Sequence, residues 1–262
     1  MDTYQNKIAL VTGASTGIGR AMAIDLAAKG AELILTARSK EQLDALAQEI
    51  QGKGGMAHVF VEDLAQPGSG ERLHQQILAA GLDVDLLINN AGYGRWGQFG
   101  EFQRDDYAAM IQLNITSLTD LCHLFMPAMV EKGEGGVINI GSSASFLPVP
   151  YATVYSSTKA YVLMLSEALR YEYAESNVRV MASCPGATDS NFRNTATEKS
   201  SERLKQRVSN NSSGLQFAKK KSLKKYLNPH FIREGIENKS NFSEIVFSEF
   251  GQETRETEPG TG

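Results

Sequence analysis

The sequence predicts an α/β fold in which helices cover both faces of a doubly wound parallel sheet. Short apolar runs alternate with amphipathic stretches along most of the chain, as in stacked βαβ units. The first apolar run leads through a glycine-rich turn into a helix, a connection typical of parallel sheets. Six apolar runs up to residue 182 are strand-like, so we expect six parallel strands, with a seventh in doubt.

The turn after the first strand is rich in glycine. We expect the strand over residues 8–11 and the following helix over residues 20–29, which Gly30 closes. Glycines at such a turn let the backbone approach a ligand closely, and the helix N-terminus attracts a phosphate. A dinucleotide site is therefore expected here, and a plain tight turn is the alternative. The residues expected to contact the dinucleotide are Gly13, Ser15, Thr16, Gly17, Ile18 and Gly19.

The second strand, expected over residues 32–36, ends beside Arg38. In dinucleotide folds an acid near this point binds the ribose hydroxyls of NAD, whereas an arginine binds the 2′-phosphate of NADP. This chain has no acid until Glu41, and a guanidinium pairs well with a phosphate. We therefore expect NADP(H) to be preferred over NAD(H). An ordinary solvated charge at Arg38 is the other interpretation.

The third strand is expected over residues 57–61, after a helix over residues 40–51. Asp63 and Leu64 follow it at the strand end where open α/β sheets bind ligands, so we expect both at the cofactor, with Asp63 near the adenine. Asp63 could equally cap the next helix, which is expected over residues 69–80.

The fourth strand, expected over residues 84–88, runs into Asn89-Asn90-Ala91-Gly92. Small residues and amides at a strand end can line a cofactor without adding bulk. We therefore place Asn90, Ala91 and Gly92 at the cofactor, although the tetrapeptide by itself is only a turn signal.

A long helix is expected over residues 105–131, and Asn114 lies within its apolar stretch. An asparagine in a buried helix lowers the helix propensity and must find hydrogen-bond partners. Asn114 therefore requires a specific explanation.

The fifth strand is expected over residues 136–140, a further helix over residues 152–175 and the sixth strand over residues 178–182. Tyr155 and Lys159 lie four residues apart on one face of that helix. A neighbouring ammonium stabilises a phenolate and so lowers the pKa of the tyrosine, which would make it a usable acid–base catalyst. Alone, the pair is a weak signal, because two exposed helix residues would look the same.

Composition sets the broad class of the protein. The chain has 262 residues, 42% hydrophobic and 21% charged, so we expect a soluble globular protein with a full core. A net charge of -4 and a pI near 5.7 argue against a nucleic-acid partner. The start lacks a signal-peptide layout, and no apolar run approaches the roughly 20 residues of a membrane helix. We therefore expect a cytoplasmic protein without a membrane span, whose Cys122 and Cys184 are reduced.

In their order and spacing these motifs resemble the short-chain dehydrogenase/reductase family. The resemblance covers roughly residues 5–195 and implies a Rossmann-type sheet, NAD(P)(H), and reversible hydride transfer between the nicotinamide and a carbonyl or alcohol. It implies no metal. The matching motifs are Thr12-Gly13-x-x-x-Gly17-x-Gly19, Asn89-Asn90-Ala91-Gly92, Asn114, Ser142, Tyr155-x-x-x-Lys159 and Cys184-Pro185-Gly186.

The resemblance also implies roles for single residues. Ser142 would orient the substrate carbonyl, Tyr155 would donate the proton, and Lys159 would lower the tyrosine pKa and bind the nicotinamide ribose. Asn114 would kink its helix and hold a water that links Lys159 to solvent, with a satisfied structural asparagine as the alternative. The loop after the sixth strand would cover the nicotinamide through Pro185, Gly186, Thr188 and Ser190, where the family usually has threonine in place of Ser190.

The C-terminal segment fits the family least. We divide the chain into a catalytic domain, residues 1–198, and a substrate lid with a variable tail, residues 199–262, which is basic where the body is acidic. Only residues 244–247 look like a seventh strand, and residues 251–262 read as disordered. The alternative function is therefore a weak or inactive NAD(P)-binding regulatory protein without a complete substrate pocket. By resemblance, the two long helices would form a homodimer or homotetramer interface.

Overall fold

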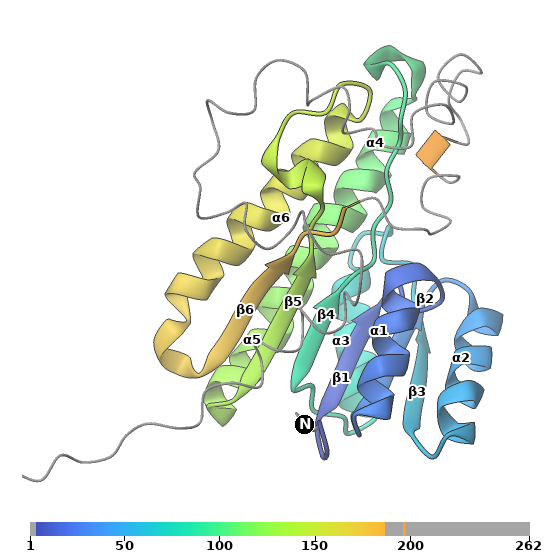
Figure 1. The fold of residues 1–262 in the computed structure, drawn as a ribbon, viewed down its shortest axis with the longest axis vertical. Helices are drawn as coiled ribbons and strands as arrows, with labels where there is room; N and C mark the ends of the chain where they lie inside the picture. The colour runs from blue at the N-terminus through green and yellow to red at the C-terminus, as the bar shows by residue number, and fades with distance from the viewer. Residues whose placement is uncertain (1–3, 187–195, 198–262) are drawn as a thin grey trace, which may run out of the picture.

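A six-stranded parallel sheet forms the centre of the fold (Figure 1). The computed structural model describes residues 4–186 and 196–197. The strand order is β3-β2-β1-β4-β5-β6, and every neighbouring pair is parallel. The doubly wound sheet with six strands is thereby confirmed, whereas residues 244–247 lie outside the described ranges. The strands are β1 (Ile8–Thr12), β2 (Glu32–Ala37), β3 (Met56–Val61), β4 (Leu86–Asn89), β5 (Gly135–Ile140) and β6 (Val178–Ser183).

Helices connect the strands and cover both faces of the sheet. Helices α1 and α2 pack on one face, and α3, α5 and α6 pack on the other (Figure 1). In the part of the chain that the structure describes, none of the helices is long and apolar enough to span a membrane. The helices are α1 (Gly17–Ala28), α2 (Lys40–Gly52), α3 (Ser69–Ala79), α4 (Arg104–Ile111), α5 (Leu118–Lys132) and α6 (Thr153–Glu172).

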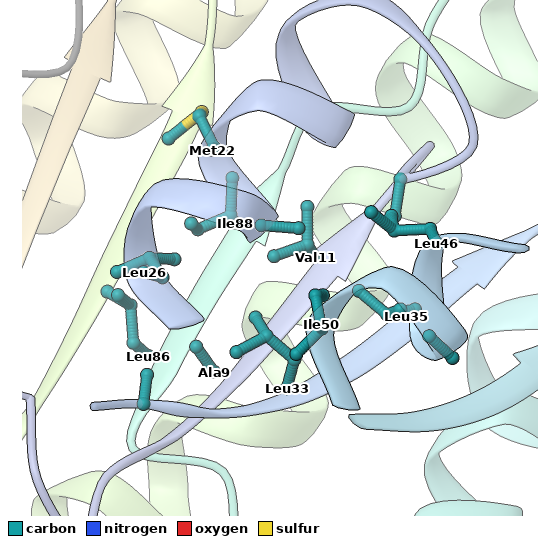
Figure 2. Packing of buried hydrophobic residues seen from close by; sticks show 14 of the residues in the cluster. Ala9, Val11, Met22, Leu26, Leu33, Leu35, Leu46, Ile50, Leu86 and Ile88 are labelled. Atoms are coloured by element: carbon teal, nitrogen blue, oxygen red, sulfur yellow. The ribbon is translucent and has the colours of Figure 1, made fainter. Parts of the chain in front are cut away.

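Two apolar cores hold these layers together, one on each face. Residues alternate along each strand, so Ala9 and Val11 of β1 face α1 and α2, whereas Leu10 faces α3 and α5. Figure 2 shows the first core, in which Leu26 of α1 and Ile50 of α2 pack over the strands. Because these side chains are almost fully buried, the sheet is a rigid base for the loops at its edge.

The long helix predicted over residues 105–131 is interrupted. Helix α4 ends at Ile111, a π-helical turn spans Gln112–Ser117, and α5 continues from Leu118 through Pro127 to Lys132. Asn114 lies inside this turn and is buried. Single π turns within helices occur frequently at functional sites.

The strand order places a switch point between β1 and β4. From β1 the chain proceeds outward to β2 and β3, and it then returns to build β4, β5 and β6 on the other side. The loops that follow β1 and β4 therefore leave the same edge of the sheet in opposite directions, which opens the crevice where such sheets bind ligands.

Candidate active site

The glycine-rich turn between β1 and α1 has the geometry of a phosphate-binding loop. Gly13 and Gly17 have positive φ angles of 63° and 57°, and a Cβ atom on Gly19 would lie 2.5 Å from the carbonyl oxygen of Gly13. The side chain of Thr16 does not cap α1, and the first helical turn carries no acidic residue. The first N–H groups of α1 therefore remain suited to an anion, and the loop fits a pyrophosphate. Ser15 lies in the same turn and Ile18 in the first turn of α1, and both are half-buried.

Asn90 and Thr12 hold that loop against the end of β4. The side chain of Asn90 donates to the carbonyl oxygens of Thr12 at 2.8 Å and of Gly13 at 3.2 Å. The hydroxyl of Thr12 accepts from the backbone N–H groups of Asn90 and Ala91, at 3.0 and 2.9 Å. These bonds across the switch point fix the two loops relative to each other.

Arg38 follows β2 at the same edge of the sheet and is exposed. Among the described residues it has no ion-pair partner, in contrast to Arg20, which pairs with Glu49, and Arg72, which pairs with Glu62. An exposed guanidinium without a carboxylate partner is available for an anionic ligand.

Asp63 closes the turn after β3. Its carboxylate accepts from the backbone N–H of Ala65 at 3.1 Å and from the side chain of Gln66 at 3.2 Å, and the neighbouring Leu64 is buried. The alternative assignment of Asp63 as a helix cap is wrong, because α3 begins after Gly68, whose left-handed backbone occupies the cap position.

Asn114 is bonded to two other segments of the site. Its side-chain N–H groups donate to the carbonyl oxygen of Tyr93 at 3.0 Å and to the hydroxyl of Thr158 at 3.0 Å. Its side-chain oxygen accepts from the N–H of Tyr93 at 3.2 Å. Both N–H bonds of the amide are thus used within the protein, so the π turn is joined to the loop after β4 and to α6.

Ser142 and Tyr155 lie together at the end of β5. Ser142 accepts a hydrogen bond from the N–H of Ala144 at 3.1 Å. Tyr155 is 7% exposed, and its burial raises its pKa, while a hydrogen bond with Ser142 acts in the opposite direction. The sequence predicted a lowered pKa for Tyr155, and that direction is wrong for this structure. The phenol is consequently in its protonated form near neutral pH.

The side chain of Lys159 is directed to the backbone at the end of β5. Lys159 is buried, and its side-chain nitrogen donates to the carbonyl oxygen of Ile140 at 2.6 Å. Burial lowers the pKa of Lys159 to about 8. A Cβ atom on Gly92 would lie 3.5 Å from that nitrogen and 3.1 Å from the side-chain oxygen of Asn114. Gly92 therefore allows the loop after β4 to lie close to both side chains.

The loop after β6 reaches the same site. The N–H of Ser143 donates to the carbonyl oxygen of Pro185 at 2.9 Å, and Cys184 has its sulfur 3.9 Å from the hydroxyl of Ser145. Cys184 lies near the pair, because a thiolate there would raise the pKa of both Tyr155 and Lys159, but burial raises the pKa of the Cys184 thiol itself. Gly186 follows as an exposed residue. Thr188 and Ser190 lie outside the described residues.

Apolar and aromatic side chains surround Tyr155. Tyr155 packs with Met110 and Ala152, and partly buried aromatic residues, including Tyr93 and Trp96, lie against this cluster. The backbone N–H of Trp96 donates to the carbonyl oxygen of Ala196 at 2.9 Å, which ties the short described segment 196–197 to the loop after β4. One side of the tyrosine is therefore an apolar wall.

Sequence reasoning missed Thr158 and Tyr93 as members of this arrangement. Thr158 lies inside the Tyr155-x-x-x-Lys159 motif but carries no chemical signal of its own, and Tyr93 contributes its backbone rather than its side chain. The one available signal was the buried Asn114, which required partners from somewhere in the fold.

Comparison with known proteins agrees with this geometry. A family model described as short chain dehydrogenase matches residues 7–201. The protein called Probable oxidoreductase EphD from Mycobacterium tuberculosis is 30% identical over 190 residues, which cover 72% of this chain and 32% of that protein. The chain thus spans about a third of the length of this relative.

Two further relatives are similar over comparable lengths. The human protein called Very-long-chain 3-oxoacyl-CoA reductase is 35% identical over 185 residues, covering 68% of this chain and 58% of that protein. A solved structure, a short-chain dehydrogenase from Sphingobium yanoikuyae in complex with NADPH, has a TM-score of 0.69 and 35% identity, covering 72% of this chain and 75% of that one.

Proposed function

Because this chain belongs to the short-chain dehydrogenase family, we propose that it is an NADP(H)-preferring oxidoreductase that interconverts a carbonyl compound and an alcohol. The observation that carries the proposal is the group formed by half-buried Ser142 and buried Tyr155 and Lys159 after β5, next to the loop that follows β4 at the switch point of the sheet. A protonated phenol, a hydroxyl and a buried amine at such a point are suited to general acid–base catalysis on a carbonyl.

Each side chain has a role in the proposed reduction. When bound, NADPH supplies the hydride to the carbonyl carbon. Ser142 and Tyr155 hydrogen-bond the carbonyl oxygen, and Tyr155 donates its proton to it, since its raised pKa keeps the phenol protonated near neutral pH. Lys159, with a pKa of about 8, is mostly cationic at neutral pH and stabilises the phenolate that results.

Asn114 contributes chiefly by position in this scheme. Both N–H groups of its amide are bonded to Tyr93 and Thr158, so the side chain holds the loop after β4 close to Lys159. We also propose a water-linked path from Lys159 to solvent beside this residue. Such a path would return a proton to Tyr155 after each turnover.

Three features support a preference for NADP(H). Arg38 is exposed at the end of β2, it has no ion-pair partner in the described ranges, and the relative from Sphingobium yanoikuyae binds NADPH. A guanidinium at this point would pair with the 2′-phosphate that distinguishes NADP from NAD. Asp63 and Leu64 would lie near the adenine, and Pro185, Gly186, Thr188 and Ser190 near the nicotinamide.

A turnover assay tests the proposal. NADPH oxidation would be followed with a panel of aldehydes, ketones, diketones and acyl thioesters, and the apolar wall at Tyr155 favours ketones with alkyl or aromatic substituents. We expect Tyr155→Phe to lower kcat by about 10²- to 10⁴-fold while NADPH binding is kept. The matched control is Tyr151→Phe, a nearby exposed tyrosine that should retain activity.

Two different outcomes would contradict the proposed mechanism and the proposed function, respectively. Full activity in Tyr155→Phe would refute the mechanism. Tight NADPH binding by the unmodified protein without turnover of any carbonyl would favour the alternative function, a cofactor-binding protein without catalysis.

The proposed partner is a second copy of the chain. Exposed apolar side chains lie on α4 at Ile111 and on α6 at Tyr161 and Met164, and Tyr161 is hydrogen-bonded at 3.0 Å to Thr119 of α5. Apolar exposure of this kind often marks an interface. Light scattering would give the mass of the particle, and Met164→Lys should shift it towards a monomer. An unchanged monomeric mass in both proteins would contradict the proposal.

A further inference from the structure

We propose that Thr158 is a positioning residue, which joins α6 to the π turn and so holds Tyr155 and Lys159 in register with the loop after β4. The inference deepens the proposed function and rests on it. Thr158 touches neither the reacting atoms nor the glycine loop, and it would act through Asn114 and through the backbone of Tyr155.

Thr158 makes two hydrogen bonds with one hydroxyl. The hydroxyl donates to the carbonyl oxygen of Tyr155 at 2.8 Å and accepts from the side chain of Asn114 at 3.0 Å. Both Thr158 and Asn114 are 1% exposed, so water does not replace either partner without a change in packing. The bond between them joins residues 44 positions apart in the sequence.

The other bonds of Asn114 extend this link to the cofactor edge. Its amide binds both the N–H and the carbonyl oxygen of Tyr93, the residue directly after Gly92. Gly92 in turn lies against both Asn114 and Lys159. Loss of the Thr158 hydroxyl would leave one buried N–H of Asn114 without an acceptor, which favours rotation of the amide and release of Tyr93.

Lys159 is adjacent to Thr158 and would respond to that release. Its nitrogen lies in a small space between the carbonyl of Ile140 and the Gly92 loop, and burial is the main influence on its pKa. If the loop loosens, water reaches the ammonium and its pKa rises from about 8 towards the ordinary lysine value. Among the described residues, Cys184 is the ionisable side chain that acts on the pKa of Lys159, and burial raises the pKa of that thiol.

Ser166 offers a matched control on the same helix. Its hydroxyl donates to the carbonyl oxygen of Val162 at 2.7 Å and accepts from the side chain of Asn139 at 3.0 Å. Ser166 is fully buried, like Thr158, and has the same pattern of one helix carbonyl and one asparagine amide. It lies outside the Tyr155–Lys159 motif, so Ser166→Ala reports the cost of losing such a hydroxyl elsewhere in α6.

The test compares Thr158→Val, Thr158→Ser and Ser166→Ala in the full chain. Valine keeps the shape of threonine but removes the hydroxyl, so we expect kcat to fall at least about tenfold, with the Kd for NADPH within about threefold of the unmodified protein. Serine restores the hydroxyl and should restore kcat to within about threefold. Ser166→Ala should lower Tm about as much as Thr158→Val while kcat stays within about twofold.

A second measurement does not depend on turnover. The pKa of Lys159 would be followed by NMR on protein labelled at the lysine ε-carbon, assigned with Lys159→Met. Thr158→Val should raise that pKa by at least about half a unit, whereas Thr158→Ser and Ser166→Ala should not.

Clear results would overturn the inference. An unchanged Lys159 pKa in Thr158→Val refutes it, and so does a kcat within about twofold of the unmodified protein where turnover is seen. Equal effects in Ser166→Ala would show a general packing role. If the unmodified protein turns over no carbonyl, the proposed function fails, and the lysine titration still decides the role of Thr158.

Discussion

The side-chain nitrogen of Lys159 lies 2.6 Å from the carbonyl oxygen of Ile140, the last residue of β5. A backbone carbonyl can accept from either the ammonium or the neutral amine, so this bond tolerates a change in protonation. Burial therefore determines the equilibrium between the ammonium and the neutral amine, and it lowers the pKa of Lys159 to about 8. A group that titrates there changes its charge within the pH range of ordinary assays.

The two directions of the reaction should therefore differ in pH dependence. Tyr155 has a raised pKa and stays protonated, which suits proton donation, so carbonyl reduction should be fastest below about pH 8, where Lys159 is cationic. Alcohol oxidation needs Tyr155 as a proton acceptor and should rise with pH. Rate profiles from pH 6 to pH 10 in both directions check this, and parallel profiles would contradict it.

Removal of the buried amine of Lys159 should abolish activity but increase the stability of the fold. The pKa of Lys159 is lower in the folded protein than its usual 10.5, so the cation opposes folding below about pH 8, and this cost disappears as pH rises towards 10.5. Lys159→Met should abolish turnover yet raise Tm by roughly 2–6 °C near pH 6.5. The gain should shrink by pH 9.5 in thermal unfolding, and a gain that is independent of pH would refute the assignment.

Cofactor preference should depend on Arg38. In Arg38→Ala we expect the Kd for NADPH to rise by about 10- to 100-fold with little change for NADH, because a charge-assisted bond to the 2′-phosphate is lost. Fluorescence titration with both cofactors measures this. Arg104→Ala is a matched control, since Arg104 is also exposed but lies at the start of α4. Equal losses for NADPH and NADH would exclude the phosphate contact.

The glycine loop should not tolerate a methyl group at Gly19. A Cβ atom there would lie 2.5 Å from the backbone oxygen of Gly13, so Gly19→Ala should cost about 1–3 kcal/mol of stability and weaken NADPH binding at least about tenfold. Gly52→Ala is the control, because nothing lies within 4 Å of a Cβ atom at that position and it ends α2. Thermal unfolding would measure the stability of both variants, and cofactor titration would measure their NADPH binding. Equal values for Gly19→Ala and Gly52→Ala would contradict the prediction.

The sequence was sufficient for those parts of the site that repeat along the chain or lie within one segment. The glycine loop, the six parallel strands and the pair Tyr155 and Lys159 follow from periodicity and from short spacings. The bond between Asn114 and Thr158 does not, because it joins two helices through a turn whose apolar pattern reads as ordinary helix. No propensity distinguishes a π turn from an α-helix in such a stretch.

The sequence also could not predict the pKa of Tyr155. The pKa of Tyr155 depends first on its burial and then on its hydrogen bond with Ser142, and both are set by the packing of distant segments. The nitrogen of Lys159 binds a backbone carbonyl, a group that every residue carries. The cap of α3 shows a related limit. Asp63 is a good capping residue by type, but the chain turns first and Gly68 takes the position.

The π turn at Gln112–Ser117 is equivalent to a helix with one residue inserted. The insertion lets Asn114 face Tyr93 and Thr158 while Leu121 and Phe125 of α5 keep their contact with the sheet. Deletion of a single residue within the turn would change the helical phase of everything on one side of it by about 100°. Either the asparagine or the apolar face would then point the wrong way, so the length of this segment is as constrained as its composition.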